Sequence, residues 1–118
     1  MGDYSRPEEY TYRSLTNRFA HQDLFGQFYI NSFPKSATIG ISNSVYIIKE
    51  YRNKGLGTKQ HKYRLKKAKE LGFQILIAIV RSSNKVEKKL LKKFKWYKLY
   101  EYYDRVKKTN IELWLKDL

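Results

Sequence analysis

One segment of this chain is almost uninterrupted in its apolar character: FQILIAIV, at residues 73–80. Such a run, without alternating polar positions, is typical of a strand that is covered on both faces, and it is far too short to cross a bilayer. We therefore predict a central strand here. Since 118 residues leave room for one core, we expect a single domain over residues 1–118, built around this strand.

Three further strands are predicted before this one, at residues 26–33, 37–41 and 45–49. They are rich in aromatic and β-branched side chains, which favour strands. Pro34-Lys35-Ser36 and Asn43-Ser44 are typical turn residues between them. Upstream, residues 8–24 carry a weak helical stripe of apolar side chains, from which we expect a helix.

Two helices are predicted, one before the central strand in the sequence and one after it. The first covers residues 57–71, ends at Gly72, and presents an inward stripe at His61, Leu65 and Ala68. The second follows Asn84, a favourable N-cap residue, and its predicted inward positions are Val86, Leu90 and Phe94. Two closing strands are predicted at residues 96–103 and 111–115.

The resulting order, β-β-β-α-β-α-β-β, predicts an α/β fold with a mixed, mostly antiparallel sheet and flanking helices. The strands at 45–49 and 73–80 are joined through the first helix, so they are predicted to run parallel and to form a central pair. The chain is then expected to divide into a short N-terminal segment, a strand meander, a loop-helix-strand-helix unit and closing strands, at residues 1–25, 26–49, 50–95 and 96–118.

The positive charge is concentrated in the second half of the chain. The net charge is +14, and residues 49–108 hold twenty basic against five acidic side chains. Such a charge attracts polyanions: nucleic acid, anionic lipid, or a phosphorylated cofactor or substrate. The alternative is a solvated lysine-rich surface without a specific partner.

Several classes of protein are not expected from the composition. No cysteine is present, which excludes disulfides and thiolate metal ligands, and the two histidines, His21 and His61, have no partners at metal-ligand spacing. We therefore expect no metal site. The N-terminus lacks an apolar signal core, so we expect a soluble, cytoplasmic protein without a membrane partner.

The most informative segment is RNKGLGT, at residues 52–58, between a predicted strand and a predicted helix. Its two glycines allow a tight turn, and the backbone N–H groups at the start of a helix attract anions. With Arg52 and Lys54 beside it, a pyrophosphate is a more natural ligand than a carboxylate. The spacing matches neither a Walker A loop nor a dinucleotide fingerprint. An ordinary strand-to-helix turn is the alternative.

In its wider context this loop resembles the GNAT superfamily of acyl-CoA-dependent N-acetyltransferases. The resemblance runs from about Val45 to the C-terminus, over IKEYRNKGLGTK (48–59), AKELGF (68–73) and the helix that follows Asn84. It implies that the loop amides hold the pyrophosphate of acetyl-CoA, and that the preceding strand pairs with the pantetheine arm where two parallel strands splay apart. The residues that it assigns to the cofactor are Tyr46, Ile47, Ile48, Arg52, Asn53, Lys54, Gly55, Leu56, Gly57, Thr58 and Asn84.

The sequence departs from the family pattern at the catalytic positions. Many members carry a tyrosine that protonates the departing thiolate, and Leu91 stands at that position; a serine that can replace it matches Glu87. Glu87 is thus the candidate proton donor, with a solvated helix residue as the alternative. No Asp or Glu lies between Asp23 and Glu50 to act as a base, so a water relay or a self-deprotonated amine is expected.

The resemblance implies an N-acetyltransferase that forms a ternary complex and transfers acetyl directly to a primary amine. About twenty-five residues precede Gly26, fewer than in most members, which implies an acceptor pocket that is built by one helix, completed by a second subunit, as in a homodimer, or open to a macromolecule. The alternative is a degenerate GNAT fold, of viral or mobile-element origin, that binds nucleic acid or a protein. Lysines at 85–98, interleaved with Phe94, Trp96, Tyr97 and Tyr100, could serve such binding or simply flank core aromatics.

Overall fold

The computed structural model describes residues 19–118, apart from the side chain of Ser44. Most of the helix expected over residues 8–24 therefore lies outside the described residues. Its last part is a wrong prediction, because Phe19–Gln22 forms a strand, β1, that pairs antiparallel with residues 27–30. Half-buried and exposed side chains alternate along β1, as in a strand, and do not follow the spacing of a helix.

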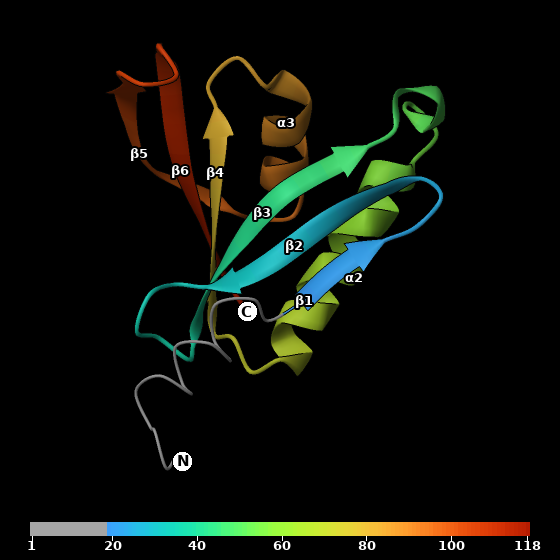
Figure 1. The fold of residues 1–118 in the computed structure, drawn as a ribbon, viewed down its shortest axis with the longest axis horizontal. Helices are drawn as coiled ribbons and strands as arrows, with labels where there is room; N and C mark the ends of the chain where they lie inside the picture. Colours follow the sequence, from blue (N-terminus) through green and yellow to red (C-terminus); the bar gives the residue numbers. More distant parts are fainter. Residues whose placement is uncertain (1–18) are drawn as a thin grey trace.

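The six strands form one sheet in the order β1-β2-β3-β4-β6-β5 (Figure 1). Only β3 and β4 run parallel, and every other neighbouring pair is antiparallel. The predicted α/β fold with a mixed, mostly antiparallel sheet is thus confirmed. The strands after β1 are β2 (Gly26–Ser32), β3 (Ile39–Ile47), β4 (Ile75–Arg81), β5 (Tyr97–Asp104) and β6 (Thr109–Asp117).

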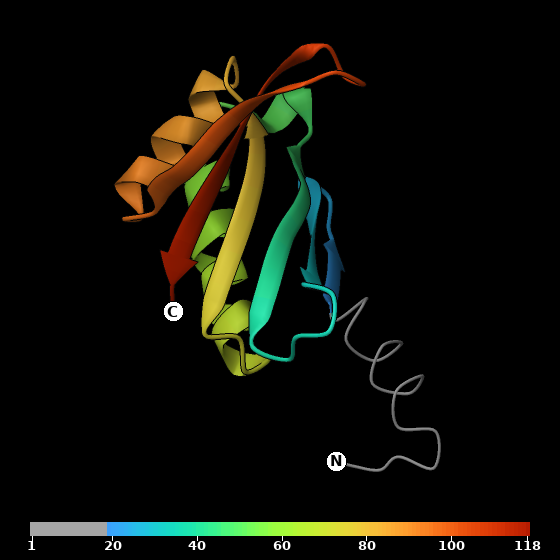
Figure 2. The same cartoon turned by 90° about the vertical axis from the view of Figure 1, so that its left-hand side faces the viewer.

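Two helices, α2 (Leu56–Glu70) and α3 (Lys85–Lys93), lie on the same face of the sheet (Figure 2). A short 3-10 turn, η1 (Lys49–Tyr51), connects β3 to the loop before α2. The predicted end of the first helix is confirmed: Gly72 follows it with a φ of +93°, a conformation that favours glycine. None of the helices among residues 19–118 is long and apolar enough to span a membrane.

Two predictions about strands are wrong. The segments expected at 37–41 and 45–49 form one continuous strand, because Asn43 pairs with Tyr29 of β2 instead of turning the chain. An irregularity in the β2–β3 register accommodates one extra residue of β3. The central strand β4 is not covered equally on both faces. Leu76, Ala78 and Val80 are buried beneath the helices, whereas Ile79 on the other face is 50% exposed.

The core lies between the sheet and the two helices. Phe28, Leu76 and Trp114 from the sheet pack with Leu91 of α3 and Ala68 of α2. In α2 the predicted inward positions are buried or half-buried, but α3 is rotated relative to its prediction. Val86 is 76% exposed and Leu91 is fully buried, because Leu91 shares a helix face with Glu87 and points to the sheet.

Candidate functional site

The parallel strands β3 and β4 pair over only four residues each and then separate. Their register runs from Ile39 opposite Ile75 to Ser42 opposite Ala78. Beyond Ser42, β3 continues to Ile47 with β2 as its strand neighbour, while β4 continues to Arg81 with β6. The edge of β3 that faces β4 is therefore open over residues 43–47, as a splayed pair requires.

A cleft of about 410 Å³ lies at this opening, between β3, α2 and α3. It brings together seven of the residues predicted for the site: Tyr46, Ile47, Arg52, Asn53, Gly57, Asn84 and Glu87. Ile48, Lys54, Gly55 and Thr58 belong to the adjoining backbone and do not line the cleft, and Leu56 lines a neighbouring cavity. The sequence analysis missed five lining residues: Val45, Gln60, Arg64, Val86 and Leu90.

At the mouth of the cleft, α2 begins without a side-chain cap. Gly55 is its N-cap residue with a φ of +77°, it makes no capping side-chain bond, and no acidic residue stands in the first turn. The N–H groups of that turn are thus left for an external acceptor. Lys93 of α3 reaches the same turn, since its Nζ lies 3.4 Å from the hydroxyl of Thr58.

Arg52 secures the chain just before this turn. Its Nε donates a hydrogen bond to the carbonyl of Ile47 at 2.8 Å, and its guanidinium lies 5.2 Å from the centre of the Tyr46 ring. Arg52 therefore joins the open edge of β3 to the loop while its other N–H groups face outward. The amide of Ile48 is already used, because it donates to the carbonyl of Phe25 at 2.7 Å.

Asn84 begins α3 and orients Glu87. Its side-chain oxygen accepts a hydrogen bond from the amide of Glu87 at 3.1 Å, which is the usual N-cap contact. Glu87 then lies in the first turn of α3 with its side chain only 13% exposed. The solvated position considered for this carboxylate is therefore wrong.

Arg64 of α2 and Glu87 of α3 form an ion pair in the wall of the cleft. Arg64 Nη2 lies 3.5 Å from Glu87 Oε2, and the arginine side chain is 1% exposed. Burial raises the pKa of the Glu87 carboxyl, and the Arg64 guanidinium acts in the opposite direction. Burial likewise lowers the pKa of Arg64, with Glu87 opposing it.

His61 lies behind Arg64 and is fully buried. Its Nε2 accepts from the indole N–H of Trp96 at 2.9 Å, and its ring stacks on Phe94 with centroids 4.4 Å apart. Burial, followed by the charges of Arg64 and Lys116, lowers its pKa to about 3. The predicted inward position of His61 is confirmed.

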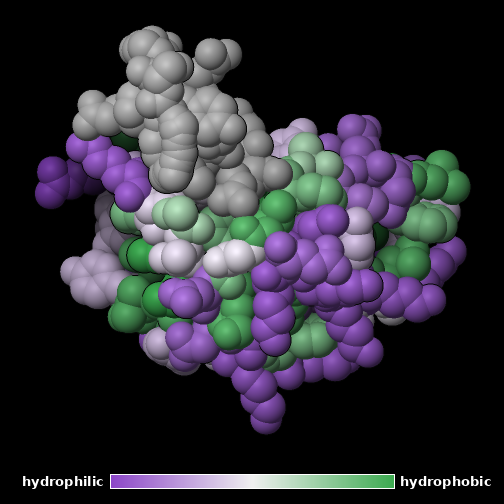
Figure 3. Space-filling model, turned by 90° about the horizontal axis from the view of Figure 1, so that it is seen from below, coloured by the Kyte–Doolittle hydropathy of each residue, from purple (hydrophilic) through white to green (hydrophobic). Residues whose placement is uncertain are grey.

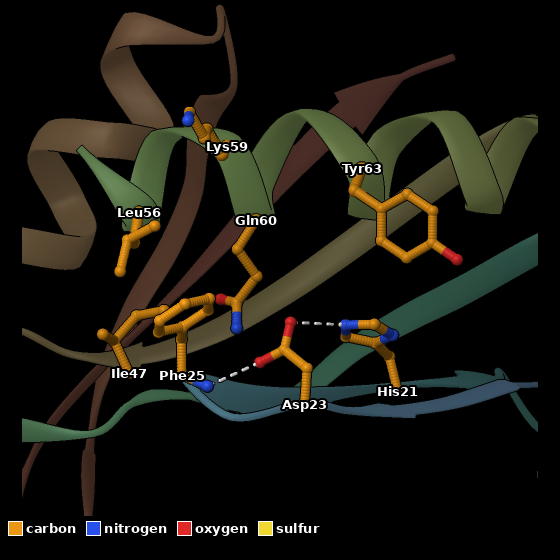
Figure 4. A pocket seen from close by; sticks show the side chains of 8 residues that line it. All are labelled: His21, Asp23, Phe25, Ile47, Leu56, Lys59, Gln60 and Tyr63. Atoms are coloured by element: carbon orange, nitrogen blue, oxygen red, sulfur yellow. Dashed lines mark hydrogen bonds and ion pairs between the residues drawn. The ribbon is translucent and has the colours of Figure 1, made fainter. Parts of the chain in front are cut away.

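A second cavity, also of about 410 Å³, adjoins the cleft on the side of β1 (Figure 4). Figure 4 shows Asp23 pointing toward His21, with Nε2 to Oδ2 at 3.1 Å, so His21 does have a partner. Gln60 lines both cavities and separates them, because its amide donates to the carbonyls of Gln27 and Tyr46, each at 3.2 Å. Among residues 19–118 no group of three or more His, Asp or Glu could hold a metal ion.

Comparisons with known proteins are consistent with this geometry. The model of the acetyltransferase (GNAT) family matches residues 6–96. A GNAT family acetyltransferase from Elizabethkingia anophelis, solved with acetyl-CoA bound, aligns with a TM-score of 0.73 at 14% identity, covering 97% of this chain and 84% of that one. Ribosomal-protein-alanine N-acetyltransferase from Brucella melitensis aligns with a TM-score of 0.72 at 16% identity, over 84% of this chain and 67% of that one.

Other similar structures are considerably longer. Ard1 from Thermoplasma volcanium aligns with a TM-score of 0.72 at 15% identity, over 80% of this chain but 63% of its own length, and the chain spans between 56% and 63% of two further structures. At these identities the likeness shows the fold alone. A search among curated proteins finds no significant match.

Proposed function

Because this chain belongs to the acetyltransferase (GNAT) family, we propose that it transfers an acetyl group from acetyl-CoA to a primary amine. The observation that carries this proposal is the cleft between β3, α2 and α3, with uncapped helix amides at its mouth and an open strand edge along one wall. Open ends of parallel strands are where α/β sheets bind ligands.

The residues present fit an acyl-CoA. The first-turn amides of α2, with Arg52 and Lys93 close by, would hold the pyrophosphate. The open edge of β3 at residues 43–47 would bind the pantetheine arm through backbone hydrogen bonds. When bound, acetyl-CoA supplies an activated thioester, and the protein's main contribution is to position it next to the amine.

Glu87 is the proposed proton donor to the departing sulfur. It lines the cleft, it is oriented by Asn84, and burial raises the pKa of its carboxyl, which favours the protonated form that a general acid needs. The Arg64 guanidinium acts on this pKa in the opposite direction. No Asp or Glu lies between residues 24 and 49 to act as a base, so the amine is proposed to lose its own proton through water or to bind already deprotonated.

The acceptor is proposed to be an amine on a macromolecule. With a net charge of +14, the protein repels small cationic amines. An amine on a nucleic acid, or on a protein that is bound to one, would instead be attracted. The structure from Brucella melitensis with the same fold is named for a ribosomal-protein alanine, and this name supports the proposal.

The proposal is tested by thermal unfolding with and without acetyl-CoA. A ligand that binds only the folded state raises the Tm, so the parent protein should show a clear upward shift. Gly57→Glu places a carboxylate at the cleft and should abolish the shift. Gln74→Glu adds the same charge at an exposed position before β4 and should leave it intact. No shift in the parent protein would overturn the proposal.

A second candidate function, nucleic-acid binding, is favoured by the outer face of the two helices. Glu70 and Glu87 are their only acidic residues; Glu70 pairs with Lys67 at 3.3 Å and Glu87 faces the cleft. Hydrophilic residues dominate the lower part of the surface in Figure 3. The exposed lysines, here named the lysine face, are Lys59, Lys62, Lys66 and Lys69 of α2 and Lys85, Lys89, Lys92 and Lys93 of α3.

The lysine face fits a nucleic acid better than a membrane. A helix that binds a bilayer surface inserts an apolar side, but the apolar sides of α2 and α3 already pack against the sheet. Two of the aromatic residues near the lysines are not available for stacking, since Trp96 is 4% exposed and Phe94 stacks on His61. Tyr97 and Tyr100 lie on β5 and are exposed.

A further inference from the structure

Arg64 is the most deeply buried cation among the described residues, and it lines the cleft. It lies on α2 seven residues after Gly57, which places it two turns further along the same helix face. At 1.5 Å per residue this is about 10 Å from the helix amides at the mouth. Arg64 is therefore at the inner end of the cleft, where the two strands come together.

The hydrogen-bonding capacity of Arg64 is not met by the protein. A guanidinium has five N–H donors and no acceptor. Its Nε is buried without any hydrogen-bond partner, and the contact of Nη2 with Glu87 is long, at 3.5 Å. A single loose ion pair leaves most of the buried charge uncompensated.

His61 does not satisfy the remaining hydrogen-bond donors of Arg64. Nη2 of Arg64 lies 2.7 Å from Nδ1 of His61, and the indole of Trp96 donates to Nε2 on the other side of the ring. A neutral imidazole has one acceptor nitrogen, and Trp96 can only donate. Arg64 can likewise only donate, so the ring accepts from one of the two and leaves the other donor without a partner.

A second buried donor lies where the strands separate. Ser42 is the last residue of β3 paired with β4, opposite Ala78, and its hydroxyl is buried without a hydrogen-bond partner. Ala78 faces the helices, and so does Ser42 at the paired position. Buried polar groups in folded proteins are almost always paired. Ser42 lies on β3 before the residues that line the cleft, whereas Arg64 lines the cleft itself. The unpartnered Nε of Arg64 therefore points to an oxygen acceptor that the bound ligand brings.

We propose that Arg64 donates a hydrogen bond to the carbonyl oxygen of the acyl group, an inference that rests on the proposed function of the cleft. During transfer the amine nitrogen forms a bond to the carbonyl carbon and the carbon–sulfur bond breaks; the sulfur leaves with the electron pair and takes up a proton, and the amine loses one. Negative charge develops transiently on the carbonyl oxygen, where a fixed buried guanidinium stabilises it most.

Glu87 and Arg64 then have separate tasks at the same end of the cleft. Glu87 faces the sulfur as the proton donor, and its 3.5 Å contact restrains the guanidinium without occupying Nε. Arg64 is a catalytic residue in this arrangement, because it touches the reacting group. A lysine could not replace it fully, since a point charge lacks the planar fork of N–H donors that contacts two acceptors at once.

The test uses binding by isothermal titration calorimetry of three ligands: CoA, acetyl-CoA and carboxymethyl-CoA, whose carboxylate takes the place of the charged oxygen. The parent protein should bind carboxymethyl-CoA at least about tenfold more tightly than CoA, since hydrogen bonds to charged groups are the strong ones. The double variant Arg64→Met/Glu87→Gln leaves no unpaired charge and should bind CoA and carboxymethyl-CoA with equal affinity; the quantity compared is the ratio of the two affinities within each variant. Its folding is checked by circular dichroism.

The outcomes separate this inference from the function on which it rests. If none of the three ligands binds the parent protein, the proposed function fails and the inference fails with it. If CoA binds but carboxymethyl-CoA has no advantage, the inference alone is overturned. The same holds if the double variant or Arg64→Lys keeps the tenfold preference in full, because the preference would then not depend on the guanidinium. Glu87→Gln leaves Arg64 in place and should keep the preference.

Discussion

At the residue scale, the buried cluster of His61, Arg64 and Trp96 illustrates how a polar group can be tolerated inside a small core. Trp96 supplies one hydrogen bond to His61 and a stacked Phe94 covers the ring. The histidine is neutral at physiological pH because its pKa is lowered to about 3. Its neutrality keeps a second positive charge away from Arg64, which is already poorly compensated.

This cluster makes stability depend on pH in a definite direction. Unfolded His61 takes up a proton below about pH 6.5, but folded His61 does so only near pH 3. Its contribution is therefore fully present above pH 6.5 and is lost as the pH falls toward 3. We expect about 2 kcal/mol to be lost between pH 8 and pH 5, measured by urea unfolding. Glu87, whose pKa is raised, acts in the opposite direction.

The variant His61→Gln isolates this effect, because it removes the titrating ring and leaves Glu87 in place. The unfolding free energy of the variant should be lower at pH 8 and should fall less steeply than that of the parent toward pH 5. His21→Gln removes the other histidine and should retain the slope that His61 causes. Equal slopes for His61→Gln and the parent would contradict the assignment of a neutral buried His61.

Two glycines next to the cleft should respond differently to the same substitution. A Cβ at Gly26 would lie 2.1 Å from the carbonyl oxygen of Tyr46, so β2 and β3 would have to separate. We expect Gly26→Ala to cost about 3 kcal/mol. At Gly57 a Cβ would meet only Leu90 at 3.4 Å, an ordinary contact, so Gly57→Ala should be neutral or slightly stabilising. Chemical denaturation of both variants measures the difference.

At the scale of elements, the start of α3 links local structure to the site. Asn84→Ala removes the acceptor for the amide of Glu87 and should lower the unfolding free energy by about 1 kcal/mol. It should also weaken any binding of acyl-CoA, because Glu87 loses its orientation. Ser83→Ala, at the exposed neighbouring position, serves as the control and should change neither quantity. An unchanged stability in Asn84→Ala would show that the cap does not restrain the helix.

The parts of the fold that could be predicted are those with a local physical cause. Gly72 ends α2 and Gly55 begins it, in both cases because a positive φ suits glycine. Asn43-Ser44 misled the prediction, because turn propensity was overridden by pairing with β2. The pair of Arg64 and Glu87 could not be predicted, since it joins two helices through packing that no sequence spacing reports.

At the scale of the whole molecule, the fold places many of the excess positive charges on one surface. The lysine face covers both helices on one side of the sheet, and Lys93 contacts Thr58 across the helix boundary. On α2 the lysines recur at intervals of three and four residues, so they form one stripe. A stripe of this kind can follow a phosphate backbone over several nucleotides.

Binding to a duplex of about twenty base pairs, measured by fluorescence anisotropy at several salt concentrations, tests the lysine face. Lys62→Glu/Lys66→Glu should weaken binding at least about tenfold and lower the slope of log K against log salt by about 2. Lys107→Glu/Lys108→Glu makes the same change of net charge in the β5–β6 turn and should have a smaller effect. Equal effects would mean that net charge, and not this surface, attracts the nucleic acid.

The short contact between β3 and β4 also has a mechanical consequence. Four paired positions on each strand are the whole seam between a half-sheet of β1 to β3 and a half-sheet of β4 to β6. A ligand that lies along the open edge of β3 and forms hydrogen bonds to it adds to the contacts between the two half-sheets. A ligand in the cleft thus takes the place of a neighbouring strand along β3. Backbone amides of both half-sheets should exchange with solvent more slowly while the ligand is bound.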